Sequence, residues 1–292
     1  MSITEPVGMR RLPACPQCAR AMEPLTLEGH YGNSVQTDLC ALCDLLWLDA
    51  LEDVNLSGLG WVQLLRRMQI AQQLDPSGPL TNKLDCPRCG VALKQVSNLN
   101  LMGRFGELEC PRCRGGLAGF AQLLARRGVL RPLTRRDLDV LQQEKREPAC
   151  MNCGAGLDRE HCARGLLDAQ ALCSYCESPL LVMDMPRFFT ALLSRHAEPV
   201  KAERLAWSCR GCGAAVEPTQ SASCKRCGHT VVVPSVLDLR PVLDAAEPLL
   251  RAALPRGAKA HGHRLRAMRG DATQTALYRY WLRLRDWFDV SS

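Results

Sequence analysis

The sequence Cys15-Pro16-Gln17-Cys18, followed after 21 residues by Cys40-Ala41-Leu42-Cys43, decides the fold of this 292-residue chain. The arrangement recurs three more times, so that 16 of the 17 cysteines form eight C-x-x-C pairs in four units. Both cysteines of such a pair can point at one centre, and two pairs supply four sulfurs in a tetrahedron. We therefore predict four metal sites, with the ligands Cys15, Cys18, Cys40 and Cys43; Cys86, Cys89, Cys110 and Cys113; Cys150, Cys153, Cys173 and Cys176; and Cys209, Cys212, Cys224 and Cys227.

The cysteine usage favours metal binding over disulfides. Residues 1–20 hold no apolar stretch typical of a secretion signal, and no run of 18 apolar residues occurs, so we predict a cytoplasmic protein without a membrane span. In a reducing compartment, clustered cysteines bind metal more often than they form disulfides. Four thiolates suit Zn²⁺ and leave no open position, which predicts four structural zinc sites. The alternatives are iron in some sites and a thioredoxin-like dithiol, which eight pairs outside a βαβ setting argue against.

The spacing of the pairs divides the chain into four units. The two pairs of a unit are separated by 21, 20, 19 and 11 residues, and stretches of 42, 36 and 32 residues lie between the units. We expect a small, metal-stabilised α+β fold: four tandem zinc ribbons built on β-hairpins, separated by helices and followed by a C-terminal amphipathic helix. A ribbon this short buries too little apolar surface to fold alone, so the metal must stabilise it. The expected segments are ribbons at 10–50, 82–117, 148–182 and 206–234, helical linkers at 51–80, 118–147 and 183–205, and a helical, basic C-terminal segment at 235–292.

Local patterns predict the elements within these segments. Short apolar runs around glycine-containing turns predict strands at 25–27 and 35–37 in the first unit and at 91–93 and 105–108 in the second. Apolar residues in a helical rhythm predict helical segments at 45–75, 117–147, 186–205, 236–254 and 273–290. The third unit follows this pattern more irregularly, and the fourth leaves room only for a minimal hairpin.

The first two units resemble a known family. In the first, C-P-Q-C at 15–18 and C-A-L-C-D-L-L-W-L-D at 40–49 are similar to the C-P-x-C and C-x-x-C-x-G-x-W-x-D patterns of bacterial zinc ribbons of the TFIIB-type zinc-finger family. Leu45 stands at the glycine position of that pattern. The second unit, with C-P-R-C-G at 86–90 and C-P-R-C-R-G-G-L at 110–117, keeps this glycine as Gly115, whereas Leu117 and Gly119 replace the aromatic and acidic residues. The resemblance implies zinc binding and a ribbon fold, but no role in transcription.

Several residues outside the pairs are candidates for other roles. Cys162 is either an additional ligand or redox-sensitive thiol, or a small buried apolar residue, and we favour the buried residue because its unit already has four cysteines. His229 follows Cys227 closely, but a complete set of four sulfurs favours a turn residue over a ligand. We expect the large aromatic residues to pack units against helices rather than to bind a partner: Trp47, Trp61, Phe188 and Phe189.

The C-terminal region concentrates the positive charge. The whole chain has 37 Lys and Arg against 30 Asp and Glu, a net charge of +7, and residues 251–292 contribute nine Arg and Lys against three Asp. Because each zinc–tetrathiolate site carries a charge of −2, the metallated remainder is acidic. Within the predicted helix 273–290, an apolar stripe is typical of docking on a partner or of capping the array, and less so of lying on a membrane: Leu277, Trp281, Leu284 and Phe288.

These features favour a non-enzymatic scaffold or adaptor that binds a protein partner through its ribbons and its C-terminal helix. The alternative is a nucleic-acid-binding ribbon protein whose basic tail contacts phosphates through Arg264, Arg266 and Arg269. The sequence contains no phosphate-binding loop, dinucleotide fingerprint, zinc-protease motif or nucleophile elbow, and we therefore expect no enzymatic activity.

Overall fold

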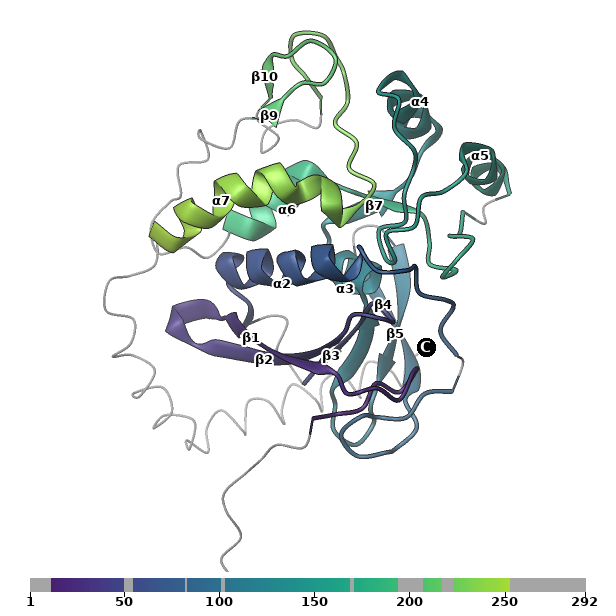
Figure 1. Ribbon diagram of the computed structural model, residues 1–292, viewed down its shortest axis with the longest axis vertical. Helices are drawn as coiled ribbons and strands as arrows, with labels where there is room; N and C mark the ends of the chain where they lie inside the picture. Colours follow the sequence, from purple (N-terminus) through teal and green to yellow (C-terminus); the bar gives the residue numbers. More distant parts are fainter. Residues whose placement is uncertain are drawn as a thin grey trace, which may run out of the picture.

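The computed structural model describes residues 12–49, 55–81, 83–100, 103–168, 171–193, 207–216 and 223–252. The predicted C-terminal helix and the three tail arginines lie outside these residues. In the described part, the fold is mixed α+β with antiparallel sheets, as predicted for its class (Figure 1).

One six-stranded antiparallel sheet joins the first two units. Its strands follow the order β1-β2-β3-β6-β5-β4, and β3 pairs directly with β6. A 3-10 turn, η1 (His30–Gly32), connects the first two strands. The strands are β1 (Glu23–Glu28), β2 (Ser34–Cys40), β3 (Leu45–Leu48), β4 (Lys94–Asn100), β5 (Gly103–Glu109) and β6 (Gly116–Gly119).

The two halves of this sheet are structural repeats. In the first unit Leu25 pairs with Thr37, and in the second Val96 pairs with Glu107 at the corresponding register position. Trp47 and Leu117 occupy corresponding places four residues after the last cysteine of each unit, and they pair with each other across β3 and β6. An approximate two-fold axis therefore runs through the centre of the sheet.

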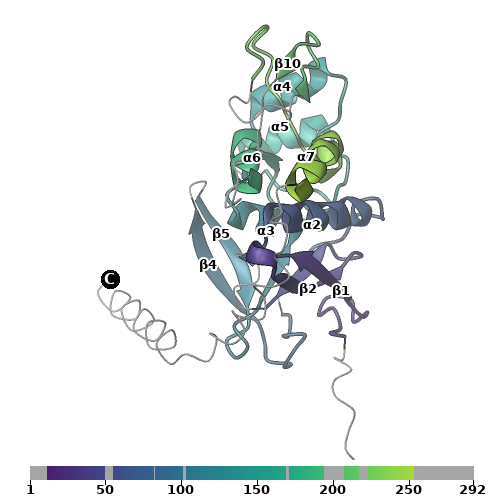
Figure 2. The ribbon, with the colours of Figure 1, turned by 90° about the vertical axis from the view of Figure 1, so that its left-hand side faces the viewer.

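Helices cover one face of the sheet in two layers (Figure 2). The helix α2 (Gly58–Ala71) lies over β1 and β2, and α3 (Phe120–Arg126) follows β6 directly. The second layer contains α6 (Met185–Leu193) and α7 (Arg240–Ala252), which is preceded by the 3-10 turn η3 (Val236–Leu239). Both α6 and α7 pack against α2.

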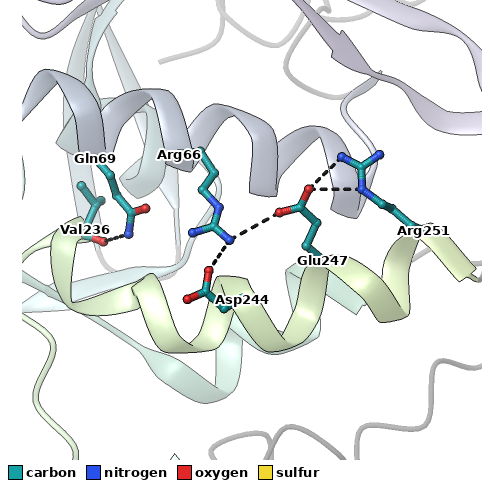
Figure 3. Close-up of polar contacts among 6 residues, drawn as sticks. All are labelled: Arg66, Gln69, Val236, Asp244, Glu247 and Arg251. Carbon is teal, nitrogen blue, oxygen red and sulfur yellow. Dashed lines mark hydrogen bonds and ion pairs between the residues drawn. The ribbon is translucent and has the colours of Figure 1, made fainter.

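Polar contacts fix α7 on α2 (Figure 3). The Arg66 guanidinium lies 2.5 Å from a carboxylate oxygen of Asp244 and 3.4 Å from one of Glu247. At the other end of the contact, the Gln69 amide donates a 2.8 Å hydrogen bond to the buried Val236 carbonyl. Residues 236–252 are thereby fixed to α2.

A single apolar core therefore contains segments from most of the described chain. It runs from Leu25 in β1 through Leu65 in α2 and Phe189 in α6 to Leu250 in α7. The helices do more than separate the ribbons, because they pack together over one shared sheet. Apolar contacts between the units, which the unit spacing does not encode, supply this core.

The third and fourth units lie beyond the helical layers (Figure 2). The third contains α5 (Arg159–Leu167) between its cysteine pairs, so a hairpin at this place is a wrong prediction. The Asp158 carboxylate caps this helix by accepting a 2.7 Å bond from the His161 amide, a capping signal that is readable in the sequence. The remaining elements are β7 (Leu130–Pro132) paired with β8 (Leu181–Met183), α4 (Arg135–Gln143), and β9 (Trp207–Ser208) paired with β10 (Ala215–Val216) in the fourth unit.

Candidate metal centres

The structure brings the 16 paired cysteines together as four groups of four. Within each group all four Sγ atoms lie within 4.8 Å of one another. We call the groups site 1 to site 4 in chain order, with the ligand sets predicted above. None of the described cysteines is in a disulfide.

The distances between sulfurs fit a tetrahedral ion. Sγ–Sγ distances between the two pairs of a site are 3.7 Å in site 1 (Cys18 to Cys40), 3.5 Å in site 2 (Cys89 to Cys110) and 3.7 Å in site 4 (Cys212 to Cys224). In site 3 they are 3.6 and 3.8 Å. A tetrahedron with metal–sulfur bonds of about 2.3 Å has edges of about 3.8 Å. The residues present therefore fit a four-coordinate ion such as Zn²⁺.

All eight C-x-x-C segments adopt one backbone shape. The residue after the second cysteine has positive φ in every case, from 52° at Asp44 to 73° at Gly154. In seven of the eight, the amide of this residue donates to the carbonyl of the first cysteine, for example at 2.8 Å from Ala19 to Cys15. The turn directs both sulfurs to one side. Four of these positions are glycine and four are not: Gly90, Gly154, Gly213 and Gly228 against Ala19, Asp44, Arg114 and Glu177.

Backbone amides and neighbouring thiols perturb the cysteine pKa values. In site 4 the backbone amide of Cys227 is the main cause that lowers the pKa of Cys224 to about 6. In site 1, hydrogen bonds from the Cys40 and Cys43 thiols lower the pKa of Cys15 to about 2, and the same contact with Cys15 raises the pKa of Cys43. Four thiols this close cannot all ionise by themselves, whereas a divalent cation stabilises all four thiolates.

Side-chain contacts link site 1 to site 2. They join the strand that follows the second C-x-x-C segment of site 1 to the first C-x-x-C segment of site 2. The Trp47 indole, fully buried, donates a 2.9 Å hydrogen bond to Asp49. The Arg88 guanidinium, from site 2, lies 3.5 Å from the other oxygen of Asp49 and 2.5 Å from the buried carboxylate of Asp38. Trp47 and Asp49 therefore connect the sulfur groups of sites 1 and 2.

Site 3 lies against the end of α2. The buried Gln72 amide donates to the carbonyls of Met151 and Asn152, at 2.8 and 3.0 Å, and its oxygen accepts from Ser235 at 3.1 Å. A Cβ on Gly154 would lie 2.8 Å from the Gln72 side chain, so a glycine is required there for close approach as well as for positive φ. The first turn of site 3 thus packs directly on α2.

The Asn152 side chain connects site 3 to α3. Its oxygen accepts a 3.1 Å bond from the Ala121 amide, and its nitrogen lies 3.8 Å from the Cys176 sulfur. In the sequence, Gln72 continues the helical spacing of Leu65 and Met68 with a polar residue. Asn152, in the middle of a C-x-x-C pair, gave no comparable signal.

A polar network around Glu144 holds site 4. The Glu144 carboxylate, whose side chain is 6% exposed, lies 2.8 Å from His229 Nε2 and 2.9 Å from the Arg146 guanidinium. Arg210, between the first two cysteines of site 4, lies 3.7 Å from the same carboxylate. His229 therefore contacts a carboxylate and belongs to none of the four sulfur groups, in agreement with its interpretation as a turn residue.

Cys162 lies outside the sulfur groups. It is fully buried in α5 and packs in the apolar cluster around site 3. Burial raises the pKa of its thiol to about 11, so the side chain is neutral at physiological pH. Its interpretation as a small buried apolar residue is confirmed.

The four large aromatic residues named above are all buried and pack in apolar clusters, as predicted: Trp47, Trp61, Phe188 and Phe189.

No helix in the described ranges has the length and apolar character that a membrane span requires. The chain matches no protein-family model, no curated protein and no solved structure.

Proposed function

We propose that each of the four sites holds a structural Zn²⁺ ion. The proposal rests on the sulfur tetrahedra and on the thiolate-stabilising turns around them. Four sulfurs complete the zinc coordination sphere, so that no position is open to water or substrate. Zinc binding of this kind stabilises a small domain by about 10–16 kcal/mol at neutral pH. The metal would therefore fix the fold and would not act as a catalyst.

The protein would accordingly act as a non-enzymatic adaptor in the cytoplasm. This proposal rests on one observation: two of the sites each expose a large apolar or aromatic side chain to solvent. Leu42, inside the second C-x-x-C of site 1, is 43% exposed, and Tyr175, at the same place in site 3, is 50% exposed. The sulfurs beside them are largely buried. Exposed apolar and aromatic side chains on a rigid, metal-fixed turn are well suited to contact a protein partner.

A second candidate function is binding of nucleic acid. One observation favours it: three basic residues, Arg210, Lys225 and Arg226, lie exposed within the C-x-x-C segments of site 4. The described residues of this unit, 207–216 and 223–231, contain no Asp or Glu. Such a turn can contact phosphates without reading sequence. Arg264, Arg266 and Arg269, which are also predicted to contact phosphates, lie outside the described residues.

Metal analysis tests the zinc proposal directly. Mass-spectrometric metal analysis of the native protein should give four zinc ions per chain, with Cys162 as the one cysteine left unbound. Two ions or fewer in undamaged protein would refute it.

Two paired variants separate the candidate functions. Leu42→Asp with Tyr175→Asp should abolish co-purification of a protein partner from the native cell, whereas Leu237→Asp, an exposed leucine on η3, should not. Lys225→Glu with Arg226→Glu should leave that partner bound. If instead only these charge reversals remove the bound material, and its retention falls steeply with salt, the nucleic-acid function is correct.

A further inference from the structure

The two halves of the six-stranded sheet differ in how their hairpins are covered. The hairpins themselves correspond pair by pair: Leu27 opposite Val35 in the first unit matches Asn98 opposite Phe105 in the second. In each unit the strand after the last cysteine, β3 or β6, leads toward a helix on the same face of the sheet. The repeat therefore predicts equal cover for both hairpins.

The first hairpin is fully covered by α2. This helix has 14 residues, and its Gly60 lies so near the end of β1 that a Cβ there would be 2.0 Å from the Glu28 carbonyl oxygen. Under it, Leu25, Leu27 and Val35 are at most 7% exposed and belong to the main core. Arg67 of α2 also pairs with Glu23 of β1.

The second hairpin has only a short helix over it. The corresponding helix, α3, has seven residues, half the length of α2. Val96, which corresponds to the buried Leu25, is only half-buried, and no described side chain of β4 or β5 belongs to the main core. β4 and β5 extend to the side away from α2 (Figure 2). The face that α2 covers in the first unit thus has no full-length helix in the described part of the second.

The sequence offers one segment with the properties of the missing helix. Residues 273–290 are 18 residues long, with an apolar stripe at helical spacing. In this segment Trp281 and Leu284 have the spacing of Trp61 and Leu64, which belong to the main core in α2.

The connection is long enough for this segment to reach the hairpin. Between the end of α7 at Ala252 and Thr273 lie 20 residues, which span up to about 66 Å when extended. A folded domain of this size is no wider than roughly 50 Å, so the connection permits docking on any face.

We propose that residues 273–290 dock in cis, as an amphipathic helix, on the face of β4 and β5 that corresponds to the face covered by α2. Leu277, Trp281, Leu284 and Phe288 would face the hairpin, with Val96 beneath them. This interaction completes the two-fold repeat and does not depend on the function proposed above.

Photocrosslinking of the full chain tests this placement. A benzophenone amino acid in place of Tyr280, beside the stripe, should crosslink within the same chain to peptides that contain residues 94–107. The same group in place of Arg279, on the polar side of the predicted helix, should not. Crosslinks from position 280 to another surface, to a second copy of the chain or to a different protein would each overturn the proposal.

Hydrogen exchange supplies an independent readout. Trp281→Ala with Leu284→Ala should raise amide exchange in β4 and β5 about tenfold or more, because the hairpin loses its cover. Val96→Asp should have the same effect, whereas Ser97→Asp, on the opposite face of β4, should not. Unchanged exchange in both stripe and Val96 variants would refute docking. A zinc content of four in all variants shows that the sites remain folded, and a lower zinc content in the wild type would refute only the proposed function.

Discussion

Gln72→Leu tests how site 3 is held on the core. Leucine has nearly the volume of glutamine, so the change leaves no cavity but removes three hydrogen bonds, to Met151, Asn152 and Ser235. All three partners lie in buried residues, where each lost hydrogen bond costs about 1 kcal/mol. We therefore expect the free energy of unfolding to fall by about 3 kcal/mol.

Gln73→Leu is the matched control, because the neighbouring residue is exposed and the substitution is the same. Urea unfolding followed by circular dichroism, at a fixed concentration of free zinc, measures both variants. A chromophoric chelator should also release one of the four zinc ions faster from Gln72→Leu than from wild type. If the two variants differ by less than about 1 kcal/mol, the docking of site 3 on α2 contributes little, and the reasoning is refuted.

Three further substitutions follow from the same structure. Gly115→Ala should lower the free energy of unfolding by about 1–3 kcal/mol in urea unfolding, because its Cβ would lie 2.5 Å from the Trp47 ring. Glu177→Gly should raise it by about 1 kcal/mol, because glycine relieves the cost of a positive φ at an exposed position. Asp137→Asn should lower it by about 2–3 kcal/mol, because the buried carboxylate binds Arg131 at 2.6 and 2.7 Å and also caps α4.

Each of these substitutions has a control in the same element. Gly116→Ala should be tolerated, since the nearest atom to its Cβ would be 3.8 Å away. Glu177→Ala keeps the strained backbone and should bring no stabilisation. Asp139→Asn changes an exposed carboxylate of α4 and should alter the free energy of unfolding by less than about 0.5 kcal/mol. Equal effects of a substitution and its control would contradict the reason given for that pair.

The grouping of the cysteines could be predicted from the sequence because it is local. In a C-x-x-C turn only two residues separate the two cysteines, and four units repeat the same arrangement. The helix at 58–71 could also be predicted from the sequence. Its apolar residues follow the 3.6-residue period of a helix and are all buried: Trp61, Leu64, Leu65 and Met68. Ser57, whose hydroxyl accepts from the Gly60 amide, caps its start.

The pairing of β3 with β6 could not be predicted from local sequence patterns. Leu45–Leu48 was predicted as the start of a helical segment, and the structure has a strand there with all four side chains buried. Leu46 and Leu48 face the helices, while Leu45 and Trp47 face the cysteine clusters. Because both faces are covered, the strand is a continuous apolar run without alternation, and periodicity does not distinguish such a run from a buried helix.

The same pairing accounts for the difference between Trp47 of the first unit and Leu117 of the second. Trp47 and Leu117 face each other across the approximate two-fold axis, on the same side of the sheet. Two tryptophans at these places would compete for one volume, and Gly115 already leaves its Cβ space to the Trp47 ring. A large residue in one repeat thus requires small residues in the other. The smaller residue at Leu117 is therefore a packing consequence of joining two ribbons in one sheet, because the Trp47 ring takes the space at the centre of the pairing.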